Sequence, residues 1–264
     1  MIIRHDLKLI FLHVPKCAGT AIRKVFREGS TDPSDIQEYW NYAFNGILHR
    51  YVDRAHLPLS DFRSYPEFNL LEVYTVIACT RHPAARLRSA VNEFYRQKSA
   101  RHEAKVKQGR LTSAMKQRYY QQLDRRHAEL DPRFIHSLPM HRFTHYGQEP
   151  KVDHLLRCES LLSDFQQLAQ TLRLPEAMLH KAATSLHHHD GDATKHPPDQ
   201  EDIELSKRLY ALDFNTFGYG NVATPTPESV VDAGQARLIH QSAQVQWHWG
   251  PRASRTHPDL APTR

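Results

Sequence analysis

The sequence predicts an α/β protein with a central parallel β-sheet and helices on both of its faces. Apolar runs at residues 7–14, 70–80 and 151–159 have the composition of strands that are buried on both sides. After each run, apolar residues recur at helical spacing. Strands that alternate with helices in this way are typical of a parallel sheet.

The first two strands each lead into a helix through a short turn. LKLIFLHV at 7–14 is followed by the turn PKCAGT and the helical pattern AIRKVF. LLEVYTVIACT at 70–80 is followed by RHPAARLRSAVNEFYRQ, where Pro83 suits the first turn of a helix. The third strand, KVDHLLRCE, precedes an amphipathic helix that should end before Pro175.

The segments between these units are expected to be mostly helical. Residues 32–48 begin with capping signals and are predicted to form a helix, and Ser60 is expected to cap another short one. A helical, basic insertion is expected at 96–145, with a break at Pro139; its residues 96–128 hold ten Lys or Arg against two acidic residues. A further helix should begin near Gln200, with acidic residues in its first turn.

Composition and length indicate one large folded domain. The 264 residues carry a net charge of +6 and 19 histidines, which fits an anionic ligand. We expect a domain over 1–221 and a Pro-rich, weakly ordered tail over 222–264. The three cysteines show no CxxC pair, and no apolar run approaches the ~18 residues of a membrane span, so a cytoplasmic protein is expected.

The turn after the first strand has the features of a phosphate-binding site. Lys16 and Thr20 flank Gly19 at a helix start, where free N–H groups and the helix dipole attract anions. The GxxxxGK[ST] pattern of a triphosphate loop is absent, and no acidic residue suggests a metal clamp. Lys16 and the backbone, without a metal, are therefore expected to neutralise the anion.

A second anion site is expected at the carboxyl end of the second strand. Arg81 leaves that strand, and Ser89 lies on the following helix, with Arg86 and Arg88 between them. Ligands of doubly wound sheets bind at the carboxyl ends of strands. Two such sites side by side suit a nucleotide with phosphates at two positions.

Four segments together resemble the carbohydrate- and Golgi-type branch of the sulfotransferases. HVPKCAGT resembles the family's HxPKTAGT loop, and RHPAARLRSA its RxPxxRxxSA segment. LLRCESLLSDFQQL resembles its strand–helix ExLxxDf, and LYALDFNTFGY its closing YxxDfxxFgY. The resemblance covers most of residues 7–220 and implies a P-loop-like, nucleoside-kinase-like fold.

The resemblance also implies the donor, 3′-phosphoadenosine 5′-phosphosulfate, and the residues that hold it. The 5′-phosphosulfate would lie on the loop residues Lys16, Cys17, Ala18, Gly19, Thr20 and Ala21. The 3′-phosphate would lie on Arg81 and Ser89, with help from Arg86 or Arg88. Cys17 stands where the family has Thr, so a hydroxyl contact is lost there. Lys195, in the polar stretch 185–197, is a further candidate for contact with the nucleotide.

Sulfuryl transfer to a hydroxyl also requires a general base, for which histidine is the obvious type. AHLPLSDF resembles a stretch that carries the base in uronyl 2-O-type relatives, and this implies His56. His49 is the alternative. His13 is expected in the core or near the site, with a satisfied hydrogen bond. The triplet 187–189 is expected in a solvated loop, and Glu159 in a structural role that orders neighbouring strands.

The predicted function is transfer of a sulfuryl group to a hydroxyl, with a carbohydrate as the expected acceptor. Two alternatives stay open: a kinase of a small hydroxyl compound, and a non-catalytic relative that binds nucleotides or nucleic acid. Nucleic acid is disfavoured, because only Tyr119 and Tyr120 interrupt the basic segment 96–128. That segment is either a solvated helical face or a surface for an anionic acceptor. No sequence feature indicates an oligomeric state.

Overall fold

A central five-stranded sheet organises the molecule. The computed structural model describes residues 1–109, 111–125, 132–186 and 197–220. The tail from 222, Lys195 and the histidines 187–189 therefore lie outside the described residues. The strand order is β3-β1-β2-β6-β9. The strands are β1 (Ile2–Arg4), β2 (Leu9–Leu12), β3 (Ile36–Glu38), β6 (Thr75–Thr80) and β9 (His154–Arg157).

The three strands expected from the apolar runs are parallel neighbours. β2 pairs with β6, and β6 pairs with β9, both in parallel. The expectation of a wholly parallel sheet is wrong at the β3 edge, where β1 runs antiparallel to both β2 and β3. Only four residues separate β1 from β2. Such a short connection permits an antiparallel return but no crossover.

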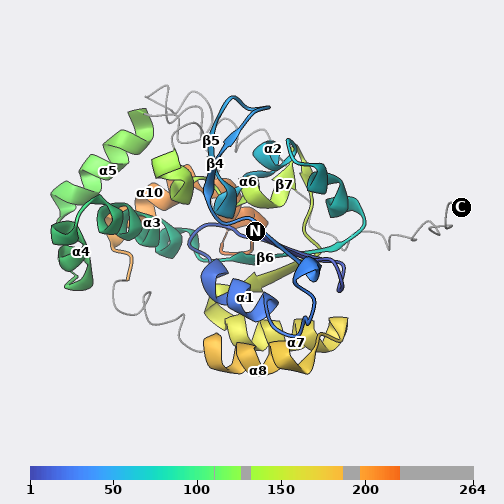
Figure 1. The fold of residues 1–264 in the computed structure, drawn as a ribbon. Helices are drawn as coiled ribbons and strands as arrows, with labels where there is room; N and C mark the ends of the chain where they lie inside the picture. Colours follow the sequence, from blue (N-terminus) through green and yellow to red (C-terminus); the bar gives the residue numbers. More distant parts are fainter. Residues whose placement is uncertain (110, 126–131, 187–196, 221–264) are drawn as a thin grey trace, which may run out of the picture.

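Helices lie on both sides of this sheet (Figure 1). Below it in the view are α1 (Gly19–Phe26), α7 (Leu161–Leu172) and α8 (Glu176–Ser185). To the left are α3 (Pro83–Lys98), α4 (Ala100–Lys107), α5 (Ser113–Arg125) and α10 (Gln200–Leu209). Above the sheet are α2 (Leu59–Phe62), α6 (His141–Thr144) and the hairpin of β4 (Tyr42–Asn45) and β5 (Arg50–Asp53).

Short elements complete the described chain. They are the 3₁₀ helices η1 (Pro33–Asp35), η2 (Arg54–His56), η3 (Pro66–Glu72), η4 (Pro132–Ser137) and η5 (Cys158–Ser160), the strand pair β7 (His145–Tyr146) and β8 (Glu149–Pro150), and α11 (Ala211–Thr216). No helix among the described residues is both long and apolar enough to cross a bilayer.

The helix expected over 32–48 does not form. The segment contains η1, β3 and β4 instead. Ile36, Gln37 and Glu38 pair with β1, and the aromatic residues of β4 suit a pleated strand better than a helix. Ser60 also does not cap a helix: α2 begins at Leu59, directly after Pro58.

The segment expected to be a basic insertion contains α4 and α5, and part of α5 is buried. Lys116 on α5 is 2% exposed and lies 2.5 Å from Asp199, at the start of α10. Tyr120 on the same helix is also buried and donates a hydrogen bond to Asp202. Because its inner face packs on α10, the insertion is not simply a solvated surface.

Candidate active site

Two loops meet at the carboxyl ends of adjacent parallel strands. Leu12 and Ala78 are direct partners near the ends of β2 and β6. The loop 13–18 follows β2, and Arg81 follows β6. The Arg81 guanidinium donates a hydrogen bond of 3.3 Å to the backbone carbonyl of Lys16. The sheet therefore brings together the two turns that the sequence marks as anion sites.

The loop before α1 presents unpaired N–H groups. Lys16 and Ala18 adopt positive φ values of 64° and 58°, an uncommon conformation for residues with a side chain. Within the described residues, the N–H groups of Ala18, Gly19 and Thr20 donate no hydrogen bond. The first turn of α1 has no side-chain cap and no acidic residue. Backbone of this kind forms a concave site for an anion.

Gly19 is required by a close approach of His13. A Cβ atom built at position 19 would lie 1.8 Å from Cδ2 of the His13 ring. Any side chain at this position would displace that ring or the start of α1. His13 itself is buried, but the satisfied hydrogen bond expected for it is not found at Nδ1, which has no hydrogen-bond partner among the described residues.

Lys16 is held by an acidic residue on α3. Its Nζ lies 3.0 Å from a carboxylate oxygen of Glu93, and both side chains are largely buried. Burial lowers the pKa of Lys16, and the Glu93 charge opposes that shift. The same Glu93 carboxylate accepts hydrogen bonds from Arg96 and Gln97. Lys16 is thus held in place by the ion pair with Glu93.

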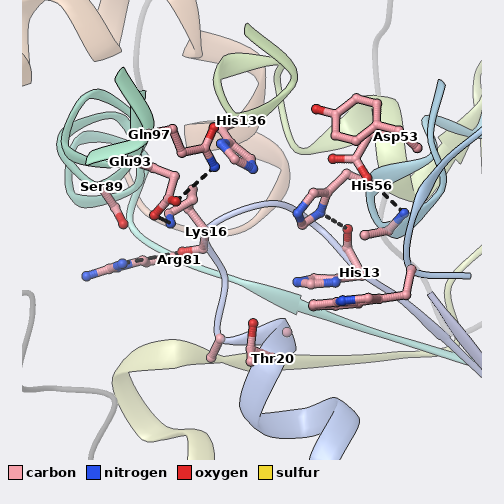
Figure 2. Close-up of a pocket in the computed structure, with 15 residues that line it drawn as sticks. His13, Lys16, Thr20, Asp53, His56, Arg81, Ser89, Glu93, Gln97 and His136 are labelled. Atoms are coloured by element: carbon pink, nitrogen blue, oxygen red, sulfur yellow. Dashed lines mark hydrogen bonds and ion pairs between the residues drawn. The ribbon is translucent and has the colours of Figure 1, made fainter. Parts of the chain in front are cut away.

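These loops line a cavity of about 420 Å³, shown in Figure 2. Its walls come from the loop after β2, from α1, α3, η4 and the β4–β5 hairpin. The lining residues are His13, Lys16, Ala18, Gly19, Thr20, Trp40, Tyr42, Asp53, Ala55, His56, Arg81, Ser89, Glu93, Gln97 and His136.

The histidine side of the cavity is built around His56. Its Nδ1 lies 3.3 Å from the carbonyl oxygen of His13, which can only accept, so Nδ1 carries the proton and Nε2 keeps a lone pair. Burial, aided by His136, lowers the pKa of His56 well below its usual value of 6.5. Burial and the Lys16 charge lower the pKa of His136 to about 4. Both rings are therefore neutral at neutral pH.

Most of the residues expected at the site line this cavity. They are Lys16, Ala18, Gly19, Thr20, His56, Arg81 and Ser89. Cys17 and Ala21 do not line it. The Cys17 side chain is buried, with its sulfur 3.9 Å from that of Met140, and the N–H of Ala21 donates to the carbonyl of Ala18. His49 is exposed in the turn of the β4–β5 hairpin and does not line the cavity.

The two arginines between Arg81 and Ser89 face the protein rather than the cavity. Arg86 is fully buried and donates to the carbonyls of His136 and Leu138. Arg88 forms ion pairs with Asp199 and Asp202. Neither is free to hold a phosphate in this arrangement.

Glu159 connects three parts of the chain. Its carboxylate accepts the N–H of His82 after β6 and the hydroxyl of Tyr219. The contacts fit the ordering role expected for this residue.

The sequence interpretation missed several lining residues. Glu93 could have been found, because it lies one helical turn after Ser89 and faces the same way. Asp53 lies three residues before His56, but nothing in the sequence separates His136 from the other histidines. Asp53, His56 and His136 also place possible metal-binding atoms within 4.8 Å of one another.

Comparison with models of protein families shows the family to which the chain belongs. A family model described as the sulfotransferase family matches residues 1–220. The chain belongs to the sulfotransferase family. Neither the curated proteins nor the solved structures gave a match. Membership in the family supports sulfuryl transfer as the reaction class, and the cavity at the ends of β2 and β6 is the candidate site for it.

Proposed function

We propose that this family member transfers the sulfuryl group of 3′-phosphoadenosine 5′-phosphosulfate to a hydroxyl of a carbohydrate. One observation carries the proposal. Lys16 lies in the middle of the cavity, with Arg81 and Ser89 on one side and His56 on the other (Figure 2). Two cations, Lys16 and Arg81, and a neutral histidine, His56, thus face one cavity. A reaction between an anionic donor and a hydroxyl acceptor requires groups of both kinds.

The donor side is assigned to the loop and to α3. The free N–H groups of Ala18, Gly19 and Thr20 would hold the 5′-phosphosulfate. Arg81 and Ser89 would hold the 3′-phosphate, because Arg81 keeps donors beyond its bond to the Lys16 carbonyl. The unit of β2, loop and α1 supports a P-loop-like fold with the lysine placed before the glycine.

The transfer step assigns opposite tasks to Lys16 and His56. The acceptor O–H would give its proton to Nε2 of His56 as its oxygen bonds to sulfur. The bond from sulfur to the 5′-phosphate oxygen breaks in line, leaving the 3′,5′-bisphosphate and a sulfate ester. Lys16 would leave Glu93 and stabilise the charge that develops on the departing oxygen. The proton ends on His56, so atoms and charge balance.

A row of aromatic side chains supports a carbohydrate acceptor. Tyr42 and Phe44 lie on one face of β4, with Asp53 and Tyr51 directly opposite on β5. Phe44 and Tyr51 are 57% and 64% exposed, while Tyr42 and Asp53 line the cavity. Exposed apolar patches on soluble proteins mark binding sites. Flat rings next to polar tips suit sugars, whose rings have C–H faces and hydroxyl edges.

Calorimetry with 3′-phosphoadenosine 5′-phosphate, AMP and ATP tests the donor site. We expect selective binding of the bisphosphate without added Mg²⁺. Arg81→Ala should weaken its binding by roughly 10- to 100-fold, since hydrogen bonds to charged groups contribute about 1.5–3 kcal/mol. The same change should affect AMP much less. Preference of the wild type for ATP would overturn the proposal, and equal losses for both nucleotides would remove Arg81 from the 3′-phosphate site.

A further inference from the structure

Three side chains that commonly bind metals converge beside the Lys16 pocket. Asp53 ends β5, His56 lies in η2 and His136 lies in η4, so the fold brings them together from separate segments. One candidate ligand atom from each lies within 4.8 Å of the other two. All three line the cavity, where Figure 2 shows them around one space.

The ligand atoms are available for coordination. The His56 Nδ1–H donates to the His13 carbonyl, which leaves Nε2 as the only lone pair of the ring. This is the pattern by which proteins orient metal-binding histidines. His136 makes no side-chain hydrogen bond to a described residue, and its backbone is held by Arg86 at 3.1 Å. Asp53 forms no ion pair with a described residue, although Ala55 donates its N–H to one carboxylate oxygen.

A fourth polar atom in the same wall also lacks a partner. His13 is 6% exposed, its ring centre lies 4.2 Å from that of His56, and its Nδ1 has no hydrogen-bond partner among the described residues. Lys16 is paired with Glu93, and the charge that acts on the Asp53 carboxylate is the N-terminal ammonium group of Met1. That ammonium group donates its hydrogen bonds to the carbonyls of Tyr39 and Ala55, so Asp53 has no ion-pair partner among the described residues.

We propose that Asp53, His56 and His136 form a binding site for Zn²⁺ or a similar divalent transition metal ion. Two imidazoles and one carboxylate with an open fourth position are a known ligand set for zinc. At ligand distances of about 2.1 Å, the tetrahedral geometry needs ligand atoms about 3.4 Å apart. The side chains would therefore close on the ion by roughly an ångström.

The site has a consequence that rests on the proposed function. The ion and the acceptor proton would compete for the same atom, Nε2 of His56. Occupation by metal would leave donor binding intact and block the acceptor, so Zn²⁺ would inhibit transfer and a chelator would restore it. The metal would be an inhibitor of the reaction rather than a part of it.

Calorimetry with ZnCl₂ on tag-free, chelator-treated protein tests the site. We expect one ion per chain at the cavity. His136→Ala should weaken binding by more than about 100-fold, because loss of an outer partner of a ligand already costs about 10- to 100-fold. Co²⁺ should give the visible absorption of a tetrahedral site in the wild type and lose it in His136→Ala.

Histidines elsewhere supply the matched controls. Replacing His187, His188 and His189 by Ala tests the polar stretch, and His180→Ala tests an exposed histidine on α8. Both variants should bind Zn²⁺ like the wild type. Loss of binding in the triplet variant with retention in His136→Ala would overturn the proposal, as would no binding at all.

Titration of 3′-phosphoadenosine 5′-phosphate into the same samples separates the two proposals. Equal nucleotide binding with and without Zn²⁺ is expected. Zn²⁺ binding without nucleotide binding would retain the metal site and reject the donor site. Nucleotide binding without Zn²⁺ binding would do the reverse.

Discussion

Lys16 illustrates how one side chain depends on its surroundings. Its positive φ turns the loop so that its carbonyl meets Arg81 while its ammonium group meets Glu93. A lysine suits this place because it is a compact charge on a flexible stem. Under the proposed function, Lys16 would move from the carboxylate to a phosphate oxygen without moving the loop.

Lys16→Ala should reduce the rate of sulfuryl transfer by about 10²- to 10³-fold, the usual loss when one group that stabilises developing charge is removed. Binding of the bisphosphate should fall much less, because the N–H groups of the loop remain. Single-turnover transfer and calorimetry measure the two effects. Lys24→Ala, at an exposed lysine on α1, the helix that follows the loop, is the control. Normal turnover of Lys16→Ala would remove this residue from the mechanism.

The environment of His56 supports the proposal that it is the general base. The His13 carbonyl fixes the tautomer, and burial keeps the ring neutral. His56→Ala should lower the turnover number by about 10²- to 10⁴-fold, the usual contribution of general acid–base catalysis. Bisphosphate affinity, measured on the same preparation, should not change. A parallel fall in nucleotide binding would mean that His56 supports the cavity wall instead of the chemistry. His49→Ala should behave like the wild type, since His49 lies outside the cavity.

At the scale of elements, sequence pattern succeeded where burial is complete. The apolar runs behind β2 and β6 are buried almost throughout and have no polar alternative that would compete with the core. The same pattern predicts β9, but the expected burial on both sides is wrong there, because β9 lies at an edge of the sheet and only Leu156 in it is buried. The pattern failed over 32–48, where short strands lie at an edge and the capping signals favour a helix equally well. Pairing of Ile36 with Arg4 decides that segment, and the partner is 32 residues away.

Under the proposed function, the exposed aromatic face of the β4–β5 hairpin would bind the acceptor. Phe44→Ser and Tyr51→Ser should each raise the acceptor KM by about tenfold, because losing about 1.4 kcal/mol of contact corresponds to a tenfold change. Turnover at saturation should be unchanged. An oligosaccharide panel with labelled donor supplies the acceptor for the measurement. Val73→Ser, at an exposed apolar residue outside the cavity, is the control. Unchanged KM values in both hairpin variants would exclude this face from acceptor binding.

At the scale of the molecule, some residues of the candidate site can be predicted from the sequence and others cannot. Lys16, Gly19 and Arg81 follow strands within a few residues, so local motif and strand position predict them. His136 and Glu93 reach the cavity through packing of η4 and α3. Their positions depend on buried links such as Arg86 to the His136 carbonyl, which a sequence pattern does not encode.

Asp213 is the centre of such a link. It is fully buried on α11 and accepts the N–H groups of Met140 and His141 at 2.7 and 3.1 Å. Its carboxylate also meets the His141 ring at 2.9 Å and lies 4.0 Å from the guanidinium group of Arg86 on α3. Met140 in turn contacts Cys17, in the loop that carries Lys16. The Asp213 carboxylate therefore connects α11 and α3 to that loop through Met140 and Arg86.

Asp213→Asn should lower the free energy of unfolding by about 3–5 kcal/mol, because it leaves the Arg86 charge buried without its counter-charge.

Burial acts to raise the pKa of Asp213, but its hydrogen bond with His141 and the Arg86 charge outweigh burial and hold that pKa below 3.8. A carboxyl group with a depressed pKa stabilises the fold above its unfolded pKa, and that stability is lost as the pH falls through the folded value. The wild type should therefore lose stability below about pH 4 more steeply than Asp213→Asn. Urea unfolding at several pH values measures both effects, with Glu204→Gln, in an exposed ion pair with Lys207, as the control that should change stability by less than about 1 kcal/mol. Parallel pH profiles for the wild type and Asp213→Asn would show that this carboxylate does not govern acid unfolding.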